Sequence, residues 1–147
     1  IDKQNINRII MTGANYLRYE QYKKVSDLVP TILNIHFGDP NKFRGLDSNL
    51  WSLLYDKFSH PAITLHHANT KLDTGKIICI KKSKSSYKEM NITDLLRFEI
   101  NTAKYCMKLA LEVKEKTINS HEVLNKGIYK GAMSSEEKKI AFSFLKQ

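Results

Sequence analysis

The sequence predicts an α/β fold, because short apolar runs of strand length alternate with segments of helical spacing over its first half. A second observation is a change in hydrophobic spacing near residue 89. From there to the end of the 147-residue chain, most segments have the spacing of helices. We expect a core over residues 1–88 and a helical C-terminal segment over residues 89–147 that packs on this core.

The first elements follow from apolar runs and the residues that interrupt them. Arg8–Thr12 is predicted to form a strand, and residues 17–28 have helical spacing up to a stop at Pro30. Residues 31–37 then predict a buried strand. Residues 38–45 are predicted to form a loop, since they contain Gly, Asp, Pro and Asn in close succession.

The following segment continues the alternation. Asp47 or Ser48 is expected to cap a helix, because both side chains accept hydrogen bonds from free backbone N–H groups at a helix start. That helix carries Trp51 among its apolar positions. Residues 62–66 and 76–81 are apolar and strand-like, so they predict two further strands.

The C-terminal segment is predicted to be mainly helical. Asn91 or Thr93 is expected to begin a long, well-buried helix that runs to about Val113. We further expect a short helix over residues 120–126 and a turn over residues 127–131. A last helix is predicted to open at Ser134–Ser–Glu–Glu137, a capping-box sequence.

The composition limits the function classes. A net charge of +9 is compatible with a polyanionic partner, but the lysines are spread along the chain and no nucleic-acid-binding motif accompanies them. We therefore do not expect a nucleic-acid partner. No stretch has the length of a membrane span, and no signal peptide is visible. Cys79 and Cys106 lack metal or disulfide spacing, which fits a reducing cytoplasm.

Three polar residues are the candidate catalytic group. Asn34 and His36 lie two apart in the apolar run Thr31-Ile-Leu-Asn-Ile-His36, so on a strand they share one face. Asp73 follows His36 by 37 positions, just before another apolar run. Together they would offer an acid, a base and an amide that polarises a carbonyl group. On spacing alone, satisfaction of backbone groups at a strand end is an equal alternative.

The motifs around these residues resemble one enzyme family. Leu33-Asn-Ile-His-Phe-Gly-Asp-Pro-Asn-Lys-Phe-Arg-Gly45 and Leu72-Asp-Thr-Gly75, at this spacing, are similar to the 10-formyltetrahydrofolate-dependent formyltransferases. The resemblance covers about residues 8–80. It implies a Rossmann-like domain with a parallel sheet, in which Asn34 and His36 hydrogen-bond the developing oxyanion and Asp73 assists His36 and the amine proton.

The resemblance also implies where the co-substrate binds. Its 10-formyltetrahydrofolate would contact the turn after the first strand and the segment before Asp73, with no metal. These cofactor-binding candidates are Thr12, Gly13, Ala14, Tyr16, Asn69 and Leu72. The substrate-binding candidates are Gly38 and Arg44. From the sequence, Arg44 is equally well explained as an anion contact or as a surface partner of Asp39 or Asp47.

Two departures refine the expected function. The family's sheet normally starts with further strand–helix units, so we expect only the C-terminal portion of the sheet here, in a fragment or processed chain that begins at Ile1. The loop Phe37-Gly-Asp-Pro40 and Leu50-Trp51 look like the branch that formylates amino sugars. We expect a nucleotide-linked amino sugar as acceptor, with a homodimer among the expected assemblies. The alternatives are a methionyl-tRNA-type formyltransferase or an inactive remnant.

One histidine pair is interpreted as structural. His66 and His67 are adjacent, so on a strand their side chains face opposite ways and do not readily share a metal ion. We expect them to position the neighbouring loop rather than to take part in chemistry.

Overall fold

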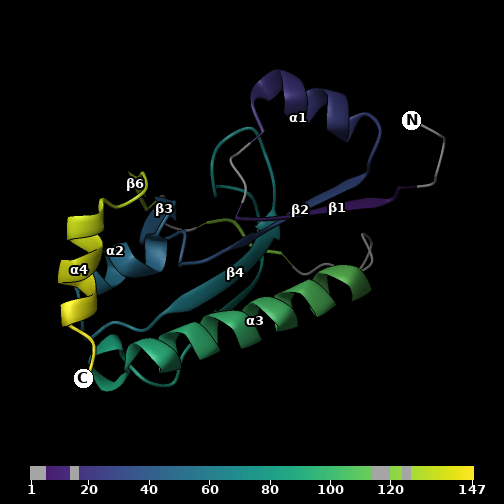
Figure 1. Ribbon diagram of the computed structural model, residues 1–147. Coiled ribbons are helices and arrows are strands. Elements are labelled where there is room, and N and C mark those ends of the chain that lie inside the picture. The colour runs from purple at the N-terminus through teal and green to yellow at the C-terminus, as the bar shows by residue number, and fades with distance from the viewer. Residues whose placement is uncertain (1–5, 14–16, 114–119, 124–126) are drawn as a thin grey trace.

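The centre of the molecule is a four-stranded sheet in the order β1-β2-β4-β5 (Figure 1). The computed structural model describes residues 6–13, 17–113, 120–123 and 127–147. The four strands are Arg8–Thr12 (β1), Thr31–His36 (β2), Ala62–His67 (β4) and Ile77–Lys82 (β5). The predicted alternation of strands and helices is confirmed over this region.

The sheet is mixed, which corrects the parallel sheet implied by the resemblance. β1 and β2 are parallel, whereas β4 runs antiparallel to both β2 and β5. The connections explain the difference. A helical crossover joins β1 to β2, as parallel neighbours require, while the short connection over residues 68–76 joins β4 to β5 as a hairpin.

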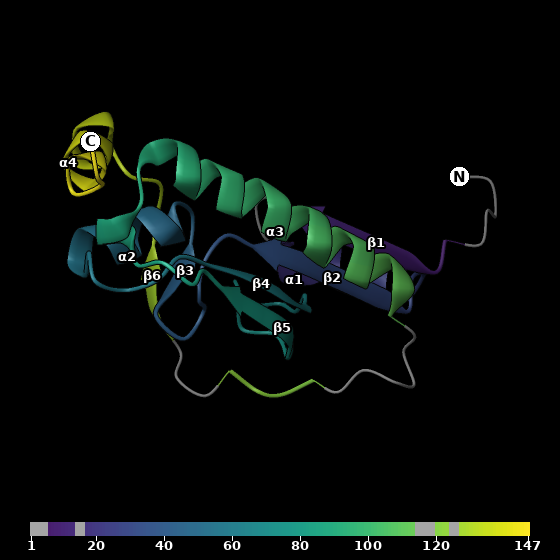
Figure 2. The same ribbon diagram turned by 90° about the horizontal axis from the view of Figure 1, so that it is seen from below.

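Helices cover both faces of the sheet. Tyr19–Ser26 (α1) lies on one face, and the long helix Ile92–Glu112 (α3) lies along the other, as both views show (Figures 1 and 2). The predicted long helix is confirmed, and Asn91 caps it by accepting a hydrogen bond from the Asp94 N–H at 2.9 Å. Within the described ranges, no helix is both long and apolar enough to cross a membrane.

A second group of elements lies at the end of the sheet remote from the N-terminus (Figure 1). Ser48–Tyr55 (α2) packs against Ser135–Ser143 (α4), and a short 3-10 helix, Tyr87–Glu89 (η1), precedes α3. Phe43–Gly45 (β3) pairs in parallel with Ile128–Lys130 (β6). The last helix begins one residue after Ser134, whose side chain accepts the Glu137 N–H as the capping-box prediction requires.

Three sequence predictions about this part of the chain are wrong. The segment holding β3 was expected to be loop and the segment holding β6 a turn, but each contributes three residues to a small sheet. The expected helix over residues 120–126 is contradicted at 120–123, where His121 instead exchanges backbone hydrogen bonds with Ile77 at 2.8 and 2.9 Å. Residues 124–126 lie outside the described part. All three segments are fixed by distant partners, which local propensity does not reveal.

The apolar core has two parts, and each combines the α/β region with the C-terminal helices. One part, under α2 and α4, contains Phe43, Trp51, Leu53, Tyr87, Leu95, Met133, Ala141 and Leu145. The other, between the sheet and α3, contains Leu33, Ile35, Ile63, Leu65, Cys106 and Ala110. Both parts therefore cross the boundary predicted at residues 88/89.

Candidate active site

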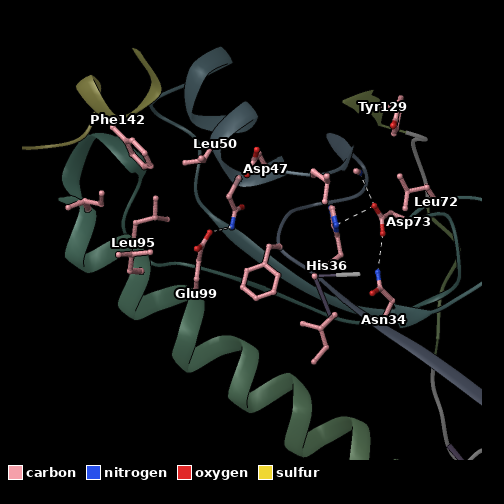
Figure 3. A pocket seen from close by; sticks show the side chains of 18 residues that line it. Asn34, His36, Asp47, Leu50, Leu72, Asp73, Leu95, Glu99, Tyr129 and Phe142 are labelled. Atoms are coloured by element: carbon pink, nitrogen blue, oxygen red, sulfur yellow. Dashed lines mark hydrogen bonds and ion pairs between the residues drawn. The ribbon is translucent and has the colours of Figure 1, made fainter. Parts of the chain in front are cut away.

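Asn34, His36 and Asp73 converge at the end of β2, as the resemblance implies (Figure 3). Asn34 and His36 come from alternate positions of the strand and project to one side. Asp73 reaches them from the loop between β4 and β5, where its backbone has a φ of 50°. Asp is one of the few residues apart from Gly that readily adopts this left-handed conformation.

Asp73 is held by hydrogen bonds on both carboxylate oxygens. Its Oδ1 accepts from Asn34 Nδ2 at 3.1 Å, and its Oδ2 accepts from the backbone N–H of Gly45 at 2.8 Å. Only 5% of the residue is exposed. Burial by itself would raise the pKa of Asp73, but the contacts with His66, His36 and the Gly45 N–H outweigh it and leave the pKa below its usual value. Asp73 is therefore a buried carboxylate that stays ionised.

The His36 ring lies between two acceptors. Its Nδ1 is 3.4 Å from Asp73 Oδ2, and its Nε2 is 3.2 Å from the backbone oxygen of Phe43. Burial lowers the pKa of His36, and the Asp73 carboxylate opposes this only in part. We assign a neutral ring that donates from Nε2 to Phe43, which leaves the lone pair of Nδ1 facing Asp73. In this protonation state His36 and Asp73 together can accept one further proton.

His66 joins this group, which corrects its interpretation as a merely loop-positioning residue. It pairs with Asn34 across the antiparallel β2–β4 ladder, so its ring lies beside the Asn34 amide. Its Nδ1 is 2.7 Å from the oxygen of His67, and its Nε2 is 3.1 Å from Asn34 Nδ2 and 3.4 Å from Asp73 Oδ1. Only the pairing of β2 with β4 shows that His66 lies beside Asn34, and this pairing cannot be deduced from the sequence alone.

These contacts fix the orientation of the Asn34 amide. Because His66 donates from Nδ1 to a carbonyl oxygen, its Nε2 accepts, and the Asn34 NH₂ group donates to both His66 and Asp73. In this state the amide hydrogens are used within the protein. For Asn34 to serve as an oxyanion donor, a bound ligand has to draw its NH₂ group away from one of these two partners.

Arg44 connects the loops around the site. It donates from Nε to the backbone oxygen of Gly127 at 2.8 Å and from Nη1 to that of Leu72 at 3.4 Å. The alternative of pairing with Asp39 or Asp47 is wrong, since Asp39 pairs with Lys82 at 2.9 Å and Asp47 with Lys138 at 3.0 Å. Arg44 thus holds the residue that precedes Asp73 against the β3–β6 region.

A cavity of about 370 Å³ lies against the three residues (Figure 3). Its walls combine Asn34, His36 and Asp73 with apolar side chains of α2, α3 and α4, among them Leu50, Leu95 and Phe142. This volume is within the range of small-molecule sites. A second hollow of about 20 Å³ lies on the other side of Asn34 and Asp73, beside His66 and Asn69.

Three of the six predicted cofactor residues line these two hollows. Gly13 lines the larger hollow, Asn69 lines the smaller, and Leu72 lines both. Thr12 is exposed at the end of β1, and Ala14 and Tyr16 lie outside the described residues. Asn69 stabilises its own loop, since its Oδ1 accepts from the Lys71 N–H at 2.9 Å and from Thr74 Oγ1 at 3.0 Å.

Gly38, a predicted substrate contact, is buried behind His36. A Cβ atom at this position would lie 2.5 Å from Ser48 Cβ and 2.9 Å from His36 Nε2. The close approach means that Gly38 leaves space for the imidazole ring. Among the described residues, no group of three or more His, Cys, Asp or Glu side chains is arranged to hold a metal ion.

No protein-family model and no curated protein sequence matches the chain. Several solved structures do. The formyltransferase PseJ from Anoxybacillus kamchatkensis, in complex with UDP-4,6-dideoxy-4-formamido-L-AltNAc and tetrahydrofolate, has a TM-score of 0.68 and 23% identity over 88% of this chain and 66% of its own. A 4-N formyltransferase from Francisella tularensis has a TM-score of 0.63 and 14% identity over 92% of this chain and 59% of its own.

A third similar structure is HypX from Aquifex aeolicus in complex with tetrahydrofolic acid. Its TM-score is 0.66, with 17% identity over 94% of this chain and 25% of HypX. The chain therefore spans less than two thirds of each of these three proteins. At such identities the likeness establishes a shared fold, which confirms the predicted resemblance at that level.

Proposed function

We propose that this chain is an N-formyltransferase that moves a formyl group from 10-formyltetrahydrofolate to a primary amine, the amine of a nucleotide-linked amino sugar. The observation that carries the proposal is the convergence of Asn34, His36 and Asp73 on a cavity of suitable size. The fold supports it, since similar structures were solved with tetrahydrofolate and with a UDP-linked formamido sugar.

The proton balance of the site suits this reaction. The amine nitrogen attacks the formyl carbon, whose C=O bond becomes an oxyanion, and the amine must lose one proton. The neutral His36 and ionised Asp73 together accept that proton in the space between Nδ1 and Oδ2. The oxyanion then re-forms the C=O bond as the C–N10 bond breaks, and the proton held between His36 and Asp73 passes to N10 of the leaving folate.

Oxyanion stabilisation requires donors that a ligand can recruit. His36 Nε2 and Asn34 Nδ2 both carry hydrogens, each of which meets a protein acceptor in the absence of ligand. An oxyanion carries more charge than the carbonyl oxygen of Phe43, so it competes for the His36 N–H as charge develops. This arrangement gives stronger binding to the transition state than to the ground state, which is the condition for rate acceleration.

In this proposal a different ligand lies at each of the two hollows. The folate ring lies against the loop before Asp73, beside the smaller hollow lined by Asn69 and Leu72, and contacts that loop largely through the loop's backbone. The larger cavity receives the acceptor. Both free cysteines, Cys79 and Cys106, fit a cytoplasmic enzyme.

The test is formyl transfer by His36 variants. His36→Ala removes the proposed acid–base ring, and His36→Gln keeps more of its volume in case the alanine variant does not fold. We expect at least a hundredfold loss of rate in both, because general acid–base groups contribute about 10²–10⁴-fold. His60→Ala is the matched control, since His60 is exposed and its ring hydrogen-bonds the Ser83 backbone oxygen.

Tetrahydrofolate binding, measured by calorimetry, gives an independent readout. Wild-type binding with lost transfer in both His36 variants supports the proposal. Full activity in a folded His36 variant would refute the assigned chemistry. Absence of folate binding in the wild-type chain would instead favour the remnant interpretation.

A further inference from the structure

Glu99 is a carboxylate on an apolar wall. The face of α3 that lines the large cavity consists of Ile92, Leu95, Leu96 and Glu99, a spacing that places all four on one side of the helix. The first three are apolar. A carboxylate as the fourth member of such a stripe is energetically unfavourable unless something binds it.

A buried network holds Glu99 in place. Asn49, of which 3% is exposed, donates from Nδ2 to Glu99 Oε1 at 2.9 Å. The Asn49 Oδ1 accepts from the Ala62 N–H at 3.0 Å and from the fully buried Tyr87 hydroxyl at 3.1 Å. These two donors fix the amide, so its NH₂ group must face Glu99. The Glu99 carboxylate is thus oriented by the neutral Asn49 amide, which Ala62 and Tyr87 in turn hold in place.

Among the described residues, the Glu99 carboxylate has no cationic partner at salt-bridge distance, since no Lys or Arg lies within 4.0 Å of its oxygens. Burial raises the pKa of Glu99, the Asn49 hydrogen bond opposes this, and the Asp47 carboxylate adds to it. A Gln at position 99 would keep the hydrogen bond from Asn49 without the cost of a buried charge. Packing alone therefore does not explain why residue 99 carries a carboxylate.

The position of Glu99 separates it from the reacting groups. Figure 3 shows Glu99 and Asp73 on opposite sides of the cavity, with the apolar Leu50 and Leu95 beside Glu99. A ligand whose amine reacts at His36 and Asp73 therefore presents a different polar group to Glu99. A carboxylate only accepts hydrogen bonds, so that group must carry an O–H or N–H.

We propose that Glu99 is an acceptor-binding residue, whose carboxylate takes a hydrogen bond from a sugar hydroxyl or amide N–H other than the reacting amine. The identity of this ligand rests on the proposed function. The adjacent apolar wall receives the non-polar face of the sugar. The carboxylate also repels phosphate, so the diphosphate of the nucleotide lies outside the cavity.

The experiment compares Glu99→Gln with wild type and with Glu112→Gln. Glu112 is on the same helix but is 62% exposed, and its contact with Lys108 at 3.9 Å is a surface pair of little energetic effect. The probe is a UDP-linked 4-amino-4,6-dideoxy-N-acetylhexosamine. Its dissociation constant is measured by calorimetry without folate, and that of tetrahydrofolate is measured separately.

We expect Glu99→Gln to weaken binding of the UDP-amino sugar about tenfold to a hundredfold, as for a lost hydrogen bond to a charged group. Tetrahydrofolate binding should be unchanged, and Glu112→Gln should match wild type for both ligands. Where transfer is measurable, the acceptor KM should rise by the same factor, with a smaller change in kcat.

The outcomes separate this inference from the proposed function. Equal affinity of wild type and Glu99→Gln for the UDP-amino sugar overturns the inference, and so does failure of the wild type to bind it. Glu99-dependent binding without tetrahydrofolate binding keeps the role of Glu99 but refutes formyl transfer. If the chain binds tetrahydrofolate and transfers formyl groups, and Glu99→Gln does so equally well, formyl transfer is kept and the role of Glu99 is refuted.

Discussion

Asp73→Asn is expected to destabilise the protein as well as to impair its chemistry. The substitution is nearly isosteric, and Asn tolerates the left-handed backbone that Asp73 adopts at a φ of 50°. Its effects therefore come from the lost charge and the altered hydrogen bonding. The carboxylate accepts from Asn34 and from the Gly45 N–H and faces the rings of His36 and His66.

The magnitude follows from the two accepted hydrogen bonds. An amide has one oxygen, so an Asn at position 73 can accept from the Gly45 N–H or from Asn34, but its NH₂ group then faces the other donor. A buried donor without an acceptor costs about 1–3 kcal/mol, and the remaining bond loses its charge assistance. We expect a loss of about 2–3 kcal/mol in the free energy of unfolding. In a domain of this size that corresponds to a fall in Tm of about 4–12 °C.

The pH dependence has a definite sign. The folded-state pKa of Asp73 is below its ordinary value of 3.8, so the carboxylate contributes stability that is fully present above 3.8. That contribution is lost as pH falls through the lower folded-state pKa. The difference in Tm between wild type and Asp73→Asn should therefore be constant from pH 7 to 8 and should narrow below about pH 4.

The assay is thermal unfolding followed by circular dichroism, between pH 3 and 8. Asp27→Asn is the control, because Asp27 is exposed at the C-terminal end of α1 and the change also removes one negative charge. An Asp73→Asn variant as stable as Asp27→Asn at pH 7, or a stability difference that widens below pH 4, would refute the reasoning.

Three further predictions concern the loop that carries Asp73 and two other residues of the site. Gly75→Ala should lower Tm by several degrees, because a Cβ there would overlap the backbone oxygen of His67, whereas Gly131→Ala, with open space, should not. His66→Gln should reduce the transfer rate about fivefold to tenfold, since the acceptor that orients the Asn34 amide is displaced. Glu99→Gln should gain in Tm relative to wild type as pH rises from 4.5 to 8, because burial raises the folded-state pKa of Glu99 and penalises its ionised form; a difference independent of pH would contradict this.

The part of the site that could be predicted from the sequence depends on local spacing. Asn34 and His36 share a face because they are two apart on one strand, whereas Asp73 is identified through the motif Leu72-Asp-Thr-Gly75. The long helix and its Asn91 cap are likewise determined within a few residues. Such relations require no knowledge of how distant segments pair.

The features that sequence reasoning missed all depend on distant partners. His66 reaches Asn34 only because β4 runs antiparallel to β2, and the sequence alone does not specify strand direction. Arg44 binds the carbonyl oxygens of Leu72 and Gly127, which lie 28 and 83 positions away. Glu99 looks like one more solvent-exposed helical charge until the fold brings Asn49 against it.

The contacts around Asp73 explain how one carboxylate can organise both structure and chemistry. It anchors the β4–β5 loop to Gly45 through Oδ2 and the Asn34 amide through Oδ1, so the loop and the strand end keep a fixed relation. The same charge leaves a place for a proton beside His36. A neutral side chain could supply the anchoring in part but not the proton acceptor. Variants at position 73 should therefore lose transfer activity by a larger factor than variants such as Gly75→Ala that only disturb the loop.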